Sequence, residues 1–113
     1  MIYIREAFDI YKELVLRFPQ SRFAPDARRR MHRLVLAQAQ HELRTAQYYY
    51  ERHAYVAAIE RAQRVVREFQ NTPMRDDALE LIRTCYEELK MDDLAKDTQR
   101  LIDINKGREK TVR

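Results

Sequence analysis

A single glycine and only three prolines occur in this chain of 113 residues, so long stretches contain nothing that interrupts a helix. Globular proteins average roughly 7% Gly and 5% Pro, and sheet proteins need these residues in their tight turns. The composition is also 45% hydrophobic and 35% charged, without tryptophan. The sequence therefore predicts an all-α chain, large enough for one domain with a modest core.

Hydrophobic residues recur at spacings of three and four in five segments, the pattern of helices that bury one side. The expected helices cover residues 4–18, 25–52, 55–69, 73–89 and 93–105. The second would be about 42 Å long at 1.5 Å per residue, which is unusual in a small domain. We expect a single domain over residues 1–105, followed by a flexible polar tail over residues 106–113.

Two internal repeats relate these segments. Tyr49 and Ala58 recur as Tyr86 and Ala95 at a shift of 37 residues. The segment that ends the first helix recurs after the third helix, at a shift of 51 residues. We assign the difference of 14 residues, about four helical turns, to the long second helix. Such repetition predicts a tetratricopeptide-type helix-turn-helix array, that is, a fragment of a helical solenoid.

The chain lacks the side-chain groupings that catalysis or metal binding requires. His32 and His41 are nine residues apart, about 180° around a helix, whereas paired metal ligands lie three or four apart. Cys85 stands in an apolar helical stripe, which predicts a buried and inert thiol. No apolar run is long enough to span a membrane. We expect a protein that is not an enzyme and that uses no cofactor and no metal.

The net charge of +4 is concentrated in the middle of the chain, because residues 22–70 carry ten arginines against five acids. Such a section favours an acidic partner, either nucleic acid or a protein face. A cluster of arginines stands near the start of the second helix, where positive charge opposes the helix dipole: Arg28, Arg29, Arg30 and Arg33. Asp26 offsets only part of that charge. An acidic partner explains this arrangement, and a solvated face is the alternative.

Two arginines of the third helix differ in their local partners. Arg64 has Glu60 and Glu68 at ideal helical spacing, so it can be paired within its own helix. Arg61 has no acid three or four positions away and lies beside the apolar stripe. An arginine without a local partner is free to bind an external carboxylate through both guanidinium nitrogens. We expect Arg61 to be the leading contact residue; a solvated or internally paired arginine is the alternative.

Three consecutive tyrosines precede the turn after the second helix. Because successive helical residues point some 100° apart, at least one of these rings is expected to be exposed. Tyr49 matches Tyr86 in the repeat and is therefore expected to pack internally. Tyr48 and Arg52 are one turn apart, which favours a partner surface or a local cation–π contact.

Three stretches of the chain resemble the C-terminal half of the BamD family (also called ComL or YfiO), periplasmic lipoproteins of the outer-membrane β-barrel assembly (BAM) machinery. They are residues 7–27, which contain Phe18-Pro19 and Asp26-Ala27, residues 46–58 and residues 72–79. The resemblance runs in the same order over nearly the whole chain. Its most specific feature is the uninterrupted long helix followed by the tyrosine-rich turn.

The resemblance implies a non-enzymatic scaffold made of the last repeats of a longer array. It implies that these repeats bind the membrane-proximal POTRA domain of BamA, and that other lipoproteins of the complex dock as well. It also places at Arg61 the family arginine that pairs with a carboxylate of this POTRA domain. The predicted partner-binding residues are Arg61, Arg52, Tyr48, Arg64, Arg28, Arg29 and Arg33. The implied location is the periplasmic face of the outer membrane, with membrane association only through a lipid anchor outside this chain.

Two other functions are compatible with parts of the sequence. A tetratricopeptide adaptor that binds an extended peptide in its groove fits the fold equally well. A helical nucleic-acid binder would use the arginine-rich second helix and lose affinity steeply with salt. Its basic residues are interleaved with acids, however, so we expect no nucleic-acid partner.

Overall fold

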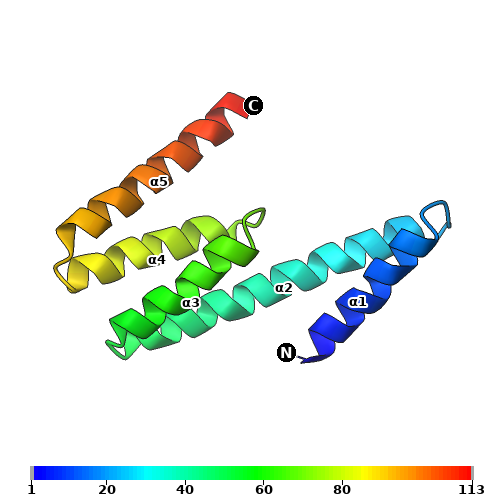
Figure 1. The fold of residues 1–113 in the computed structure, drawn as a ribbon, viewed down its shortest axis with the longest axis horizontal. Coiled ribbons are helices and arrows are strands. Elements are labelled where there is room, and N and C mark those ends of the chain that lie inside the picture. Colours follow the sequence, from blue (N-terminus) through cyan, green and yellow to red (C-terminus); the bar gives the residue numbers. More distant parts are fainter. Residues whose placement is uncertain (1, 113) are drawn as a thin grey trace. The chain divides into compact units, whose positions relative to one another are not determined.

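A computed structural model describes residues 2–112, with side chains described for residues 5–107. The elements are α1 (Ile2–Arg17), α2 (Ala24–Glu51), α3 (Tyr55–Glu68), α4 (Met74–Glu88) and α5 (Asp92–Val112) (Figure 1). Every element within residues 2–112 is a helix, and consecutive helices are joined by short turns. The predicted all-α, tetratricopeptide-like fold is confirmed.

The first four helices begin and end within two residues of the predicted bounds. The predicted end of α5 near residue 105 is wrong, because the helix continues to Val112. The added segment is polar, but it contains no proline and one glycine, Gly107, and a single glycine weakens a helix without stopping it. A single domain over residues 1–105 with a flexible tail over residues 106–113 stays a prediction.

The chain divides into two compact units, residues 1–40 (unit 1) and residues 41–113 (unit 2). Unit 1 holds α1 and the first part of α2. Its buried hydrophobic residues, among those described, are Ala24, Ala27 and Ala39. Small side chains allow two helices to approach closely but remove little apolar area from water. The described part of unit 1 is therefore a thin helical hairpin.

Unit 2 holds the larger core, which joins the end of α2 to α3, α4 and α5 (Figure 1). Its buried apolar residues are Leu43, Ala46, Ala58, Ile59, Ala62, Val65, Phe69, Ala78, Leu79, Ile82, Cys85, Ala95 and Ile102. Alanines at Ala58, Ala62 and Ala78 are fully buried and let neighbouring helices approach. This is the packing that a helical repeat array needs between successive pairs.

The turns after α2 and α4 share one backbone structure, at the predicted shift of 37 residues. His53 and Lys90 both adopt a left-handed conformation, with φ of 63° and 59°. In each turn the next backbone N–H donates to the carbonyl of the aligned tyrosine, Tyr49 or Tyr86, at 2.9 Å. This pair of turns is a Schellman closure of a helix C-terminus. The repeat read from the sequence is thus present in the main chain.

The turns after α1 and α3 match in the same way, at the shift of 51 residues. The N–H of Ser21 donates to the carbonyl of Phe18 at 3.0 Å, and the N–H of Thr72 donates to the carbonyl of Phe69 at 3.2 Å. The two phenylalanines differ in burial, because Phe18 is 59% exposed and Phe69 only 7%. The turn geometry therefore repeats, while the packing of the ring does not.

Candidate protein-binding surface

An ion pair connects α2 and α3 within unit 2. Nη1 of Arg64 lies 3.8 Å from Oε2 of Glu42, and the two side chains are 39% and 16% exposed. The expectation that Arg64 can pair with Glu60 or Glu68 in its own helix is wrong. Those two glutamates are exposed and hydrated, whereas Oε2 of Glu42 is buried without a hydrogen-bond partner among the described residues. A buried carboxylate needs a nearby positive charge more than a hydrated one does.

The Glu42–Arg64 pair also fixes the register between the two helices. The two residues lie equally far, in sequence, from His53 in the turn, so α2 and α3 run antiparallel with Arg61 level with Thr45. Arg61 is half-buried, and within the described part of the chain its guanidinium makes no ion pair or hydrogen bond. Of the two readings left open for Arg61, internal pairing is not found among the described residues. Its role in binding stays a prediction.

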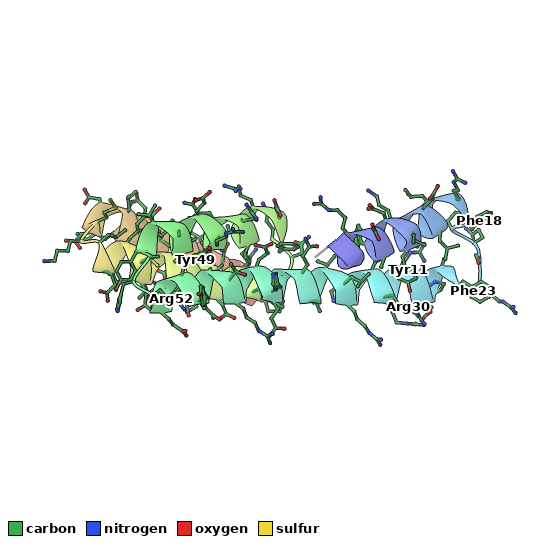
Figure 2. The ribbon with its side chains drawn as sticks, turned by 90° about the horizontal axis from the view of Figure 1, so that it is seen from below. Tyr11, Phe18, Phe23, Arg30, Tyr49 and Arg52 are labelled. Atoms are coloured by element: carbon green, nitrogen blue, oxygen red, sulfur yellow. The ribbon has the colours of Figure 1, made fainter. Side chains whose placement is uncertain are left out.

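Tyr48 and Arg52 form an exposed stack near the end of α2. The guanidinium carbon of Arg52 lies 4.5 Å from the centre of the Tyr48 ring. Tyr48 is 49% exposed, and the edge of the adjacent Tyr49 ring contacts it at a centroid distance of 5.6 Å. Figure 2 shows Arg52 where α2 ends. The exposed ring expected among the three tyrosines is thus Tyr48, and the local cation–π contact is formed.

Tyr55 completes an aromatic cluster around this turn and was not among the predicted binding residues. Its hydroxyl lies 2.9 Å from Nδ1 of His53, and its ring packs edge-on to Tyr50 at 5.8 Å. Desolvation, with a smaller repulsion from Glu88, raises the pKa of the Tyr55 hydroxyl. The aromatic residues on both sides of the turn were the sequence signal from which this cluster could have been predicted. The cluster thus lies beside the end of α2 that carries the exposed stack.

We call Tyr48, Arg52, Arg61 and Arg64 the α2–α3 surface. On α2, Thr45 follows Glu42 by three residues and Arg52 follows Tyr48 by four, and on α3 Arg61 precedes Arg64 by three. Glu42 offsets the charge of Arg64. The remaining arginines, Arg61 and Arg52, therefore carry the uncompensated positive charge. A guanidinium of this kind can donate two parallel hydrogen bonds to one carboxylate.

The other predicted residues, Arg28, Arg29 and Arg33, lie in unit 1. Asp26 pairs with Arg29 at 3.6 Å and with Arg30 at 2.9 Å. Arg30 also donates to the hydroxyl of Tyr11 at 3.2 Å, and this hydrogen bond, with Asp26, raises the pKa of Arg30 (Figure 2). Arg28 and Arg33 are exposed and make no ion pair among the described residues. The predicted set thus falls into two groups, one on each unit.

A shallow groove crosses the other side of α3 in unit 2. Its volume is about 350 Å³. The groove is lined by Gln63, Val66 and Arg67 of α3, by Leu79, Ile82 and Tyr86 of α4, and by Thr98 and Leu101 of α5. Half of the lining residues are aliphatic, and Arg67 is the one charged residue among them. An extended chain segment with apolar side chains fits this chemistry.

Groups for redox or metal chemistry are not assembled in the described residues. No cluster of three or more histidine, cysteine or acidic side chains occurs there that could hold a metal ion. Cys85 is fully buried, as predicted, and this burial, with a smaller effect of Glu88, raises the pKa of its thiol to about 11. Its reactive thiolate form is therefore scarce at neutral pH. None of the helices described is long and apolar enough to cross a membrane.

Comparison with known proteins gives one consistent result. Residues 1–101 match the YfiO family model, described as an outer membrane lipoprotein. The chain is 42% identical over 101 residues to outer membrane protein assembly factor BamD of Neisseria meningitidis serogroup A, covering 89% of this chain and 38% of that protein. It is 37% identical over 105 residues to BamD of Pasteurella multocida, covering 93% and 40%. With BamD of Vibrio cholerae it shares 34% identity over 102 residues, covering 90% and 42%. The chain thus spans about two fifths of the length of these relatives.

Proposed function

We propose that this chain, which belongs to the YfiO family of outer membrane lipoproteins, acts as a non-enzymatic scaffold in the assembly of outer membrane proteins. The relatives are named as assembly factors, and a scaffold needs a rigid surface rather than a catalytic centre. We place it at the periplasmic face of the outer membrane. Its partner there is the membrane-proximal POTRA domain of BamA, with other lipoproteins of the complex as further partners.

The proposal rests on the environment of the Arg61 side chain. Its guanidinium is half-buried and makes no ion pair or hydrogen bond among the described residues, so no internal carboxylate competes for it. Partial burial also removes some water from an arriving carboxylate, which strengthens a bidentate pair. Arg64, one turn away, is occupied by Glu42. The expected geometry is therefore one carboxylate of the POTRA domain on Arg61.

The exposed stack of Tyr48 and Arg52 supplies the second contact. Tyrosine and arginine are the residues most often found at the energetic centre of protein interfaces. The existing cation–π contact at 4.5 Å holds both side chains in place before binding. Less side-chain entropy is then lost when a partner arrives. We expect this stack to lie beside the Arg61 contact and to exclude water from it.

Calorimetry with the isolated POTRA domain tests this proposal. Arg61→Glu should weaken binding by at least about tenfold, because a desolvated charge pair becomes a like-charge contact. Arg67→Glu is the matched control: it makes the same charge change on the same helix, at an exposed position facing the α3–α4–α5 groove. The proposal fails if the unaltered chain shows no binding, or if both variants weaken it equally.

A peptide-binding adaptor remains the second candidate, and the groove between α3, α4 and α5 favours it. Leu101 lines this groove and is 51% exposed, so a charged side chain there would block an apolar peptide without greatly disturbing the core. Peptide binding would be lost in Leu101→Glu and retained in Arg61→Glu. The opposite pattern, sensitivity to Arg61→Glu alone, supports the POTRA contact.

A further inference from the structure

The turn between α1 and α2 exposes two aromatic rings. Phe18 is 59% exposed and Phe23 is 57% exposed, and Figure 2 shows both at the closed end of the α1–α2 hairpin. The matching turn in unit 2 makes the same main-chain hydrogen bonds with its phenylalanine buried. The turn therefore does not require an exposed ring. Two exposed rings at one turn are an apolar feature that a binding partner could cover.

The segment that carries these rings is rich in positive charge. Residues 18–33 contain five arginines and a single acid, Asp26. Asp26 pairs with Arg29 and Arg30, and so leaves Arg22, Arg28 and Arg33 without an ion pair among the described residues. The guanidinium of Arg22 stacks on the Phe23 ring at 4.9 Å, so charge and ring are presented together. We call Phe18, Arg22, Phe23, Arg28, Arg29 and Arg33 the basic-aromatic tip.

We infer that the basic-aromatic tip binds the surface of a bilayer that contains anionic phospholipids. Phenylalanine rings can bury in the outer part of the acyl chains when basic residues lie beside them, and those arginines bind the phosphates of the headgroups. Protein partners usually hold aromatic anchors in well-packed pockets, whereas here the rings stand at the convex end of a hairpin. This shape and charge favour a fluid anionic surface over an acidic protein face.

This inference extends the proposed function and does not depend on it. The POTRA contact uses unit 2, whereas the tip belongs to unit 1. The family is described as outer membrane lipoproteins, which places a bilayer within reach of its members. The sequence alone predicted membrane association only through a lipid anchor. The tip adds a second, protein-borne contact with the bilayer.

Tryptophan fluorescence gives a direct test, because the chain contains no tryptophan of its own. Phe23→Trp places a single probe on the tip, and Tyr48→Trp places the control probe on unit 2 at a position of similar exposure. Mixed phosphatidylethanolamine and phosphatidylglycerol vesicles should shift the Phe23→Trp emission to the blue. Phosphatidylcholine vesicles should not. The inference is overturned if anionic vesicles leave this emission unchanged, or if they shift the control equally.

Charge reversal tests the arginines separately. Arg28→Glu with Arg33→Glu should lower partitioning onto the mixed vesicles by more than about twentyfold, since each lost arginine accounts for roughly fivefold. Arg44→Glu with Arg67→Glu changes the net charge by the same amount at exposed positions of unit 2, and should have a much smaller effect. Equal losses in both pairs would contradict the inference. So would binding of the tip to polyglutamate without any binding to vesicles, which would indicate an acidic protein partner.

Discussion

At the scale of single residues, Arg61 and Arg64 differ in what surrounds them although one helical turn separates them. Arg64→Ala would leave the buried oxygen of Glu42 without a compensating charge, whereas Arg61→Ala removes no ion pair or side-chain hydrogen bond of the described residues. We expect the first change to lower the free energy of unfolding by about 1–2 kcal/mol, because Arg64 is partly exposed and solvent screens the pair. The second should change it by less than about 0.5 kcal/mol.

Urea unfolding of both variants, with Glu42→Gln and the double variant to complete the cycle, measures this difference. A stability loss in Arg61→Ala as large as that in Arg64→Ala would mean that Arg61 is held internally. Local spacing was enough to identify Arg61 as unpaired in its own helix. The same local spacing predicted the wrong partner for Arg64, because Glu42 is twenty-two residues away in sequence and becomes a neighbour only when α2 and α3 pack.

At the scale of elements, the five helices were predictable because proline, short polar turns and periodic apolar residues all marked the same boundaries. The repeat at a shift of 37 residues also predicted which turns would match. What the sequence did not show was how each turn is closed. His53 and Lys90 take the left-handed conformation that glycine usually supplies, so their identities hid the closure. The end of α5 was predicted too early, because a polar segment was taken to mark the end of the helix.

Glycine at the left-handed positions should stabilise both helix ends. Lys90→Gly relieves a backbone conformation with φ of 59° that costs a side-chain-bearing residue about 1 kcal/mol, so we expect a gain of that order. His53→Gly should gain less, because it also removes the 2.9 Å contact between Nδ1 and the Tyr55 hydroxyl. Thermal unfolding compares the two variants directly. A destabilised Lys90→Gly would show that the Lys90 side chain contributes more than its backbone strain costs.

At the scale of the whole molecule, the uneven core leads to a prediction about which part of the chain folds alone. Every large buried apolar side chain of the described residues lies in unit 2, while unit 1 buries alanines. A fragment of residues 41–113 should therefore keep its helices and unfold cooperatively, and residues 1–40 alone should be mostly unfolded, as expected for a chain of that length without a crosslink. Circular dichroism at rising temperature tests both fragments.

The same fragments separate the two proposed surfaces. Residues 41–113 retain all four members of the α2–α3 surface, so the fragment should bind the POTRA domain within about threefold of the full chain. It lacks the basic-aromatic tip and should lose binding to anionic vesicles. If POTRA binding disappears while the fragment still unfolds cooperatively, unit 1 must contribute contacts, and Arg28 and Arg33 become the first candidates. Retention of vesicle binding would instead move the membrane contact onto unit 2, because no residue of the tip would be present.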